Sequence, residues 1–185
     1  FAEVREVFTR LRGGISTCSL LTSYRSSPEI TEIFAGLLPA EQRTKISSVQ
    51  RASEPVRVDC YGNDDEYAAA LREAVAHAKE NDGLTAIVVP WKHEAKRLRA
   101  FLGDAADGLV DMETAAELPT NGGMIITLQL AKGLEFDHVI VPDASARVFP
   151  ADDRVAKNRL YTTVSRATRS VQILCRGEIT PLLKK

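Results

Sequence analysis

The run LTAIVVP, residues 84–90, constrains the fold more than any other part of the chain. Its seven residues are almost continuously apolar, so a strand made from them would be buried on both faces. Strands of that kind occur in parallel sheets that carry helices on both sides. Two further short apolar runs, MIIT at 124–127 and HVIVP at 138–142, have the same character. The sequence therefore predicts an α/β protein with a buried, mostly parallel sheet.

Segments with helical spacing of apolar residues alternate with these candidate strands. The expected helices cover 2–12, 28–38, 64–80, 92–102 and 155–165, and the expected strands cover 16–22, 56–60, 84–90, 124–128, 138–143 and 170–175. Ser27 is expected to cap the second helix, with Pro28 in its first turn. Residues 41–55 are polar and are expected to form a loop. The alternation indicates one layered α/β domain spanning residues 1–185.

Composition excludes several classes of protein. The chain has 185 residues and a net charge of −1, so no overall basic field points to nucleic acid and any such contact must be local. The cysteines Cys18, Cys60 and Cys175 are widely spaced and odd in number, which predicts reduced thiols in a cytoplasmic protein and no metal site. No apolar run approaches the ~18 residues of a membrane span. A first residue of Phe1 rather than Met suggests a fragment of a longer protein.

Three polar clusters are expected at the carboxyl ends of strands, where open α/β sheets bind ligands. They are Tyr24-Arg25, the segment from Gln129 to Glu135, and Arg166. Arginine suits phosphate because its planar, permanently charged group donates two parallel hydrogen bonds. A glycine such as Gly133 allows close approach of the backbone to a ligand. Glu135 could accept hydrogen bonds from sugar hydroxyls and Tyr24 could stack on a base, so together these groups could hold a nucleotide.

Each of these residues also has a purely structural interpretation. A Tyr-Arg turn is commonly an ordinary surface turn, and lysine and glutamate often flank turns. Arg166 could instead bind the last carbonyl groups of its own helix. His93, beside Trp91 and Lys92, could line a path for nucleic acid or simply pack at the start of a helix. His77 is expected to be solvated, and His138 to be structural.

Three motifs resemble those of UvrD/Rep-type superfamily 1 helicases. The stretch LTSYRSSPEI resembles motif IV, TLQLAKGLEFDHVIV resembles motif V, and NRLYTTVSRAT resembles motif VI with Ser165 in place of threonine. They occur in the order that the family shows and span nearly the whole chain. The resemblance implies a RecA-like fold, the second of two motor domains, and half of an ATP site.

The resemblance also implies roles for particular residues. Arg166 would be the arginine finger and Arg25 would reach the terminal phosphates. Glu135 would hold the ribose, Tyr24 would lie near the adenine, and Gly133 would lie close to the nucleotide. Single-stranded DNA would touch Thr127 and Gln129, with Lys132 beside them.

The chain departs from the family pattern in three ways. Gln129 replaces the usual histidine of motif V, which puts that DNA contact in doubt. Only about 20 residues, 103–123, stand where many members insert a subdomain, as in compact HelD-like relatives. No GxxxxGK[ST] loop is present, so the ligands of ATP phosphates and Mg²⁺ are expected on an N-terminal motor domain of the same polypeptide. Three alternatives stay open: a HelD-like factor that remodels RNA polymerase, a degenerate domain of a helicase–nuclease, and a nucleotide-binding-like α/β domain with no activity.

Overall fold

The computed structural model describes residues 2–13, 15–16, 22–43, 46–53 and 55–184. Its main sheet has six strands, all parallel, in the order β3-β8-β7-β4-β6-β5. The strands are β3 Arg57–Tyr61, β4 Leu84–Val89, β5 Val110–Asp111, β6 Gly122–Thr127, β7 Phe136–Val141 and β8 Ala167–Arg176. The predicted parallel sheet is confirmed, and its central strand β4 is buried at every residue.

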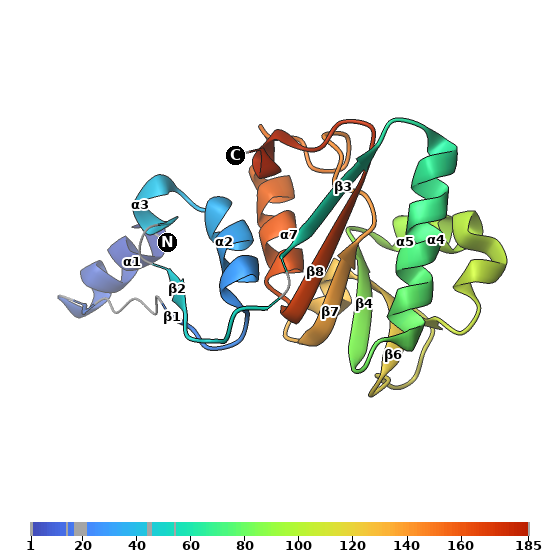
Figure 1. Ribbon diagram of the computed structural model, residues 1–185. Coiled ribbons are helices and arrows are strands. Elements are labelled where there is room, and N and C mark those ends of the chain that lie inside the picture. Colours follow the sequence, from blue (N-terminus) through green and yellow to red (C-terminus); the bar gives the residue numbers. More distant parts are fainter. Residues whose placement is uncertain (1, 14, 17–21, 44–45, 54, 185) are drawn as a thin grey trace.

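Helices cover both faces of this sheet, as Figure 1 shows. The helices of the described residues are α1 Ala2–Arg12, α2 Pro28–Gly36, α3 Ala40–Arg43, α4 Asp64–Glu80, α5 Lys92–Leu102, α6 Leu128–Ala131 and α7 Arg154–Val164, with short 3₁₀ turns η1 Gly103–Ala106 and η2 Pro181–Leu183. Polar side chains cap the starts of three of them. The Ser27 hydroxyl accepts a hydrogen bond from the backbone of Ile30 in α2, and Asn63 and Asp153 do the same for α4 and α7.

The core has two parts, one on each face of the sheet. On one face, Leu71 of α4 and Leu98 of α5 pack with Ile87 of the sheet. On the other face, Ile30 of α2 and Leu160 of α7 pack in a separate buried cluster. This arrangement is a three-layer α/β fold, which confirms the predicted fold class.

Three local expectations need correction. Residues 17–21 of the strand expected at 16–22 lie outside the described residues. The Thr22–Ser23 end forms β1, which pairs with β2 (Ser47–Ser48) in a separate two-stranded parallel sheet and not in the main one. The predicted loop at 41–55 contains α3 and β2, and the polar turn after β6 begins with the short helix α6. These elements are two to four residues long, too short for a periodic pattern to reveal.

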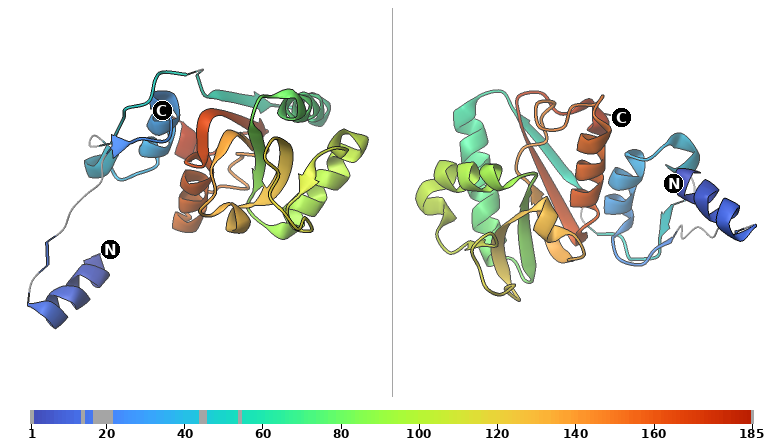
Figure 2. Two further views of the ribbon diagram at one scale, coloured as in Figure 1. Left: turned by 90° about the horizontal axis from the view of Figure 1, so that it is seen from below. Right: turned by 180° about the vertical axis from the view of Figure 1, so that it is seen from behind.

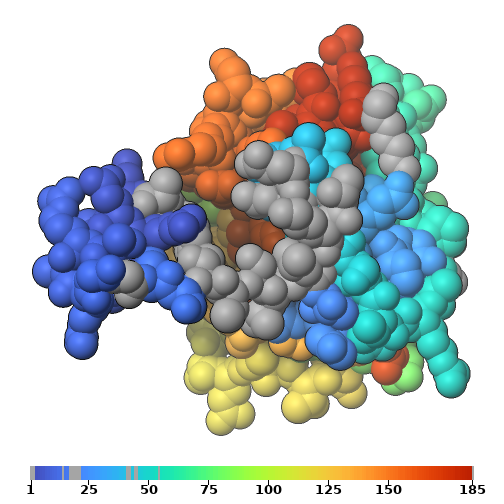
Figure 3. All heavy atoms as spheres, turned by 90° about the vertical axis from the view of Figure 1, so that its left-hand side faces the viewer, coloured from blue at the N-terminus to red at the C-terminus, as the bar shows by residue number. Residues whose placement is uncertain are grey.

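Helix α1 forms where the sequence predicts it, but its apolar side is open. Val4, Val7, Phe8 and Leu11 are each at least half exposed. Figures 2 and 3 show α1 standing out from the rest of the molecule. No helix within the described part of the chain is long and apolar enough to cross a lipid bilayer.

Candidate nucleotide and nucleic-acid sites

Two groups of candidate residues lie at opposite edges of the main sheet. Glu135 immediately precedes β7 and Arg166 immediately precedes β8, so both lie at the amino-terminal edge. The backbone N–H of Phe136 donates to the carbonyl of Arg166 at 3.0 Å, which joins the two positions directly. Their expected place at the carboxyl ends of strands is wrong, because a crossover in a parallel sheet returns the chain to the amino edge before the next strand starts.

Arg25 joins these two residues from a distant part of the sequence. It lies in the loop between β1 and α2, where the Ser26 hydroxyl donates to the carbonyl of Ala167 at 2.7 Å. This bond fixes the loop to the first residue of β8. The Arg25 guanidinium then forms an ion pair with the Glu135 carboxylate. The structure thus brings together residues that the sequence could not show to meet.

Arg166 completes this cluster. Its Nη1 donates to the carbonyl of Leu134 and its Nε to the carbonyl of Thr162, both at 3.3 Å. Burial is the main cause that lowers the pKa of Arg166, and the neighbouring Arg25 cation lowers it further, while the Glu135 carboxylate opposes the shift. Arg25, Glu135 and Arg166 therefore interact electrostatically with one another, and we call them the amino-edge cluster. The structural interpretation of Arg166 also holds in part, since Thr162 belongs to its own helix.

The other residues expected at the nucleotide lie close in sequence to this cluster. Gly133 has a φ of +84°, a conformation that side-chain-bearing residues rarely adopt, and a Cβ placed there would meet no atom within 4 Å. The space beside this backbone is therefore open to a ligand. Tyr24 is 73% exposed, and its carbonyl accepts a hydrogen bond from the Gln50 side chain. Its ring is free to stack against a planar group.

The candidates for nucleic acid start at the opposite, carboxyl edge with Thr127, and Gln129 and Lys132 follow on the segment that leads back toward β7. Thr127, the last residue of β6, is only 4% exposed, and its hydroxyl donates to Glu113 at 2.8 Å. The same carboxylate lies 3.3 Å from the ammonium of Lys92. Gln129 and Lys132 are exposed. The DNA contact assigned to Thr127 stays a prediction, and in this structure the Thr127 hydroxyl is engaged within the protein.

An aromatic and cationic surface adjoins this edge. Trp91 and His93 stack with ring centroids 5.7 Å apart and an angle of 15° between the rings. The Arg159 guanidinium lies over the Trp91 ring, 4.6 Å from its centroid. Sequence reasoning noticed Trp91 and His93 but missed Arg159 and Glu113. No local signal identifies those two, because they reach the surface from α7 and from the segment after β5.

The remaining histidines behave as the sequence predicts. His77 is exposed, with Nε2 3.9 Å from a Glu73 oxygen. His138 is held at the sheet by Ser170 at 2.7 Å and by the carbonyl of Asp82 at 3.2 Å. Within the described ranges, no group of three or more His, Cys, Asp or Glu side chains could hold a metal ion.

Comparisons with known proteins concern the family and the fold. Residues 122–174 match the family described as the UvrD-like helicase C-terminal domain. The fold is similar to the crystal structure of the C-terminal domain of a possible DNA helicase from Lactobacillus plantarum WCFS1. That match has a TM-score of 0.70 and 26% identity, and covers 88% of this chain and 92% of that chain.

A weaker similarity, to the PRRSV helicase, has a TM-score of 0.40 and 14% identity, and covers 85% of this chain and 23% of that chain. The search of curated proteins found no match. The family match includes β6, β7, α7 and most of β8, together with Glu135 just before β7 and Arg166 just before β8. The match at residues 122–174 and the shared three-layer fold show that this chain is similar to UvrD-like helicase C-terminal domains.

Proposed function

We propose that this chain is the second motor domain of an ATP-dependent superfamily 1 DNA helicase or translocase, and that its amino-edge cluster completes an ATP site shared with an N-terminal motor domain. The supporting observation is the convergence of Arg25, Glu135 and Arg166 from three separate segments. Two guanidinium groups beside one carboxylate match the chemistry of a nucleotide, since phosphates pair with arginine and ribose hydroxyls donate to a carboxylate.

The roles that we propose for the three side chains are those that the motif resemblance implies, and their positions are compatible with them. Arg25 and Glu135 are paired with each other but remain 40% and 49% exposed, so the pair can exchange for ligand contacts at little cost. Arg25 then faces the terminal phosphates and Glu135 the ribose. Arg166 is oriented by the Leu134 and Thr162 carbonyls, and stabilises the charge that develops during phosphoryl transfer. Tyr24 lies near the adenine, and Gly133 leaves room for the nucleotide.

ATP supplies the phosphoryl group, and Mg²⁺ neutralises charge on its phosphate oxygens. The residues present here fit the nucleotide, with two cations, one acceptor and open space at Gly133. The phosphate-cradling loop and the Mg²⁺ ligands belong to the N-terminal motor domain. This domain alone would bind ATP weakly.

Single-stranded DNA would follow the carboxyl edge of the sheet. Trp91 and His93 offer stacked ring faces there, and Lys92, Gln129 and Lys132 supply exposed polar groups. Base stacking on aromatic side chains contributes about 1–3 kcal/mol per base. Thr127 would contact DNA only after releasing its hydrogen bond to Glu113.

The segment from Leu128 to Glu135 would couple the two ligands. It starts at the carboxyl edge, next to the proposed DNA path, and ends at the amino edge in the nucleotide cluster. A shift of Glu135 as the interdomain cleft closes is therefore transmitted along a short, partly helical segment to Gln129. Such a connection would convert ATP-driven closure into a step along the strand.

The test is the ATPase activity of the full-length protein with and without single-stranded DNA. We expect DNA-stimulated hydrolysis that Arg166→Ala lowers by about 10³-fold or more, as for other arginine fingers. Arg169→Ala is the matched control, because Arg169 lies nearby in β8 but pairs with Asp137 at 3.2 Å, outside the cluster. Turnover by Arg166→Ala close to that of Arg169→Ala would remove the finger role, and no hydrolysis by the wild-type protein would overturn the proposed function.

A further inference from the structure

The strand order creates a second candidate site where β4 and β7 lie side by side. The chain leaving β7 leads through α7 to β8, whereas the chain leaving β4 leads the other way, through α5 toward β5 and β6. In open α/β sheets, the crevice outside the carboxyl ends at such a reversal is a preferred ligand site. A pocket of about 260 Å³ lies there, and its lining includes Pro90 after β4 and Pro142 after β7.

The floor of this pocket, which we call the switch-point pocket, is aromatic. Tyr67 of α4 and Phe101 of α5 have ring centroids 5.9 Å apart and are tilted by 41°. Tyr67 is buried and its hydroxyl donates to the Pro142 carbonyl at 2.8 Å. Burial raises the pKa of Tyr67, so this donor keeps its proton. Phe101 is 39% exposed, so part of its ring is available to a planar ligand.

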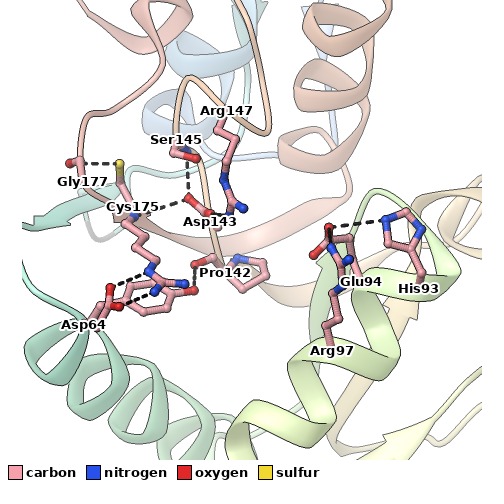
Figure 4. A network of polar contacts seen from close by, with 12 residues as sticks. Asp64, His93, Glu94, Arg97, Pro142, Asp143, Ser145, Arg147, Cys175 and Gly177 are labelled. Atoms are coloured by element: carbon pink, nitrogen blue, oxygen red, sulfur yellow. Dashed lines mark hydrogen bonds and ion pairs between the residues drawn. The ribbon is translucent and has the colours of Figure 1, made fainter.

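Charged side chains also line the pocket, and Figure 4 shows Glu94, Arg97, Asp143 and Arg147 among them. Arg97 lies 3.4 Å from a Glu94 oxygen, and Arg147 lies 3.2 Å from an Asp143 oxygen. Both arginine side chains are more than 70% exposed, so these pairs are weak and either guanidinium can turn to an external anion. Asp143 is more firmly held, because it accepts a hydrogen bond from the backbone of Ser145 at 2.9 Å.

The pocket adjoins the aromatic surface at the same edge through Glu94. His93 stacks on Trp91, and its Nε2 lies 3.4 Å from Glu94, which lines the pocket. The aromatic pair and the pocket thus lie next to each other at the start of α5, where one nucleic-acid strand could contact both. The volume is below the roughly 300–1,000 Å³ of sites for drug-sized ligands, which suits a single planar group rather than a whole nucleotide.

We propose that the switch-point pocket receives one unstacked base of the bound single-stranded DNA, with Phe101 against the base and Arg97 and Arg147 on the adjoining phosphates. This inference rests on the proposed function, because it requires single-stranded DNA at the carboxyl edge. The pocket would fix the position of the bound DNA along the protein, because one nucleotide has its base in the pocket and the neighbouring nucleotides do not.

The experiment uses the full-length protein and a series of single-stranded oligonucleotides, each with 2-aminopurine at one position. We expect one position to show a fluorescence change distinct from its neighbours, and Phe101→Ala to abolish that difference. Phe101→Ala should also weaken binding by about 5- to 100-fold, the range for loss of one base–aromatic contact. Arg97→Ala should reduce the slope of log affinity against log salt by about one, as expected for loss of one phosphate contact.

Lys96→Ala is the matched control, because Lys96 is exposed on the same helix but does not line the pocket. A smaller effect of Lys96→Ala than of Arg97→Ala on both salt slope and affinity would support the pocket. The wild-type protein could bind the oligonucleotides tightly with the same fluorescence change at every 2-aminopurine position, and Phe101→Ala could bind them equally well. That result would overturn the role of the pocket and leave the proposed function standing. Absence of any binding by the wild-type protein would overturn both.

Discussion

Arg25 and Glu135 form an ion pair that joins the loop before α2 to the residue preceding β7. Both side chains are 40% or more exposed, so the pair contributes about 0–1 kcal/mol to folding. Strong stabilisation is therefore not its function. The pair instead holds two oppositely charged groups at one edge of the sheet, beside Arg166, in a form that a ligand can rearrange.

Glu135→Ala should leave the fold intact and weaken nucleotide binding. Loss of the ion pair should lower the melting temperature by no more than about 4 °C. Loss of hydrogen bonds from a ribose to the carboxylate should weaken ATP binding by roughly 10- to 100-fold. Calorimetric melting and titration with a fluorescent ATP analogue, both on the full-length protein, measure the two effects. Glu117→Ala, at an exposed glutamate elsewhere, is the control, and equal ATP affinity in the two variants would exclude Glu135 from the site.

Sequence patterns predicted the long elements well and the short ones poorly. Helices α4 and α5 have the predicted bounds, because a run of apolar positions and a clear end define each helix. The two-residue strands β1, β2 and β5 carry no pattern of their own. Their hydrogen bonds depend on neighbours far away in the sequence, as Thr22 with Ser47 shows.

The sequence selected the residues of the candidate site, whose roles stay predictions, but not their geometry. The motif resemblance selected Arg25, Glu135 and Arg166, and the structure brings them together. Their predicted edge of the sheet was wrong, because the chain crosses back to the amino edge before β7 and again before β8. The Arg159–Trp91 contact could not be predicted, since it joins two helical regions that meet only after the sheet has formed.

Two glycines with positive φ should respond differently to alanine. Gly133→Ala forces a φ near +84° on an alanine with open space around it, so we expect destabilisation of about 1–2 kcal/mol. Gly83 has a φ of +102°, and a Cβ there would lie 2.4 Å from an Asp137 oxygen. That carboxylate accepts the backbone hydrogen bond of Leu84 at 2.9 Å, so it cannot move away freely.

Gly83→Ala should therefore cost more than Gly133→Ala, by about 1 kcal/mol or more. Urea unfolding of the two variants and the wild type gives the comparison. Equal losses would mean that Asp137 relaxes without cost. A larger loss for Gly133→Ala would contradict the local packing described for both glycines.

Cys175 should be chemically inert although its strand neighbour is exposed. Cys175 is fully buried, and Cys60 stands beside it in the register of β3 and β8. Burial raises the pKa of Cys175 to about 12, with a further contribution from Cys60. At pH 8 only about one thiol in ten thousand would then be ionised. Iodoacetamide at pH 8, followed by peptide mapping, should label Cys60 and leave Cys175 protected; comparable labelling of both would contradict the burial of Cys175.

The same shift predicts a dependence of stability on pH. The pKa of Cys175 in the folded state lies above the unfolded value of about 8.5, so the folded state holds its proton more tightly. Its contribution to stability is complete below pH 8.5 and is lost as the pH rises from there toward 12. Unfolding in urea between pH 8.5 and 10 should show a loss of up to about 1.4 kcal/mol per pH unit, and Cys175→Ala should flatten this slope. An unchanged slope in the variant would assign the pH dependence to other groups.

Trp91 should contribute to DNA binding through its ring and not through charge. Its stacked partner His93 and the overlying Arg159 hold the indole at the carboxyl edge, where 36% of the residue is exposed. Trp91→Ala should weaken binding of single-stranded DNA by about 5- to 100-fold, whereas Trp91→Phe should retain most of the affinity because a phenyl ring also stacks on bases. Since no cation is removed, the salt dependence of binding should keep its slope in both variants. Fluorescence anisotropy with a labelled oligonucleotide at several salt concentrations measures both quantities. Equal weakening by alanine and phenylalanine would show that the indole acts by packing beneath Arg159 and not by stacking on a base.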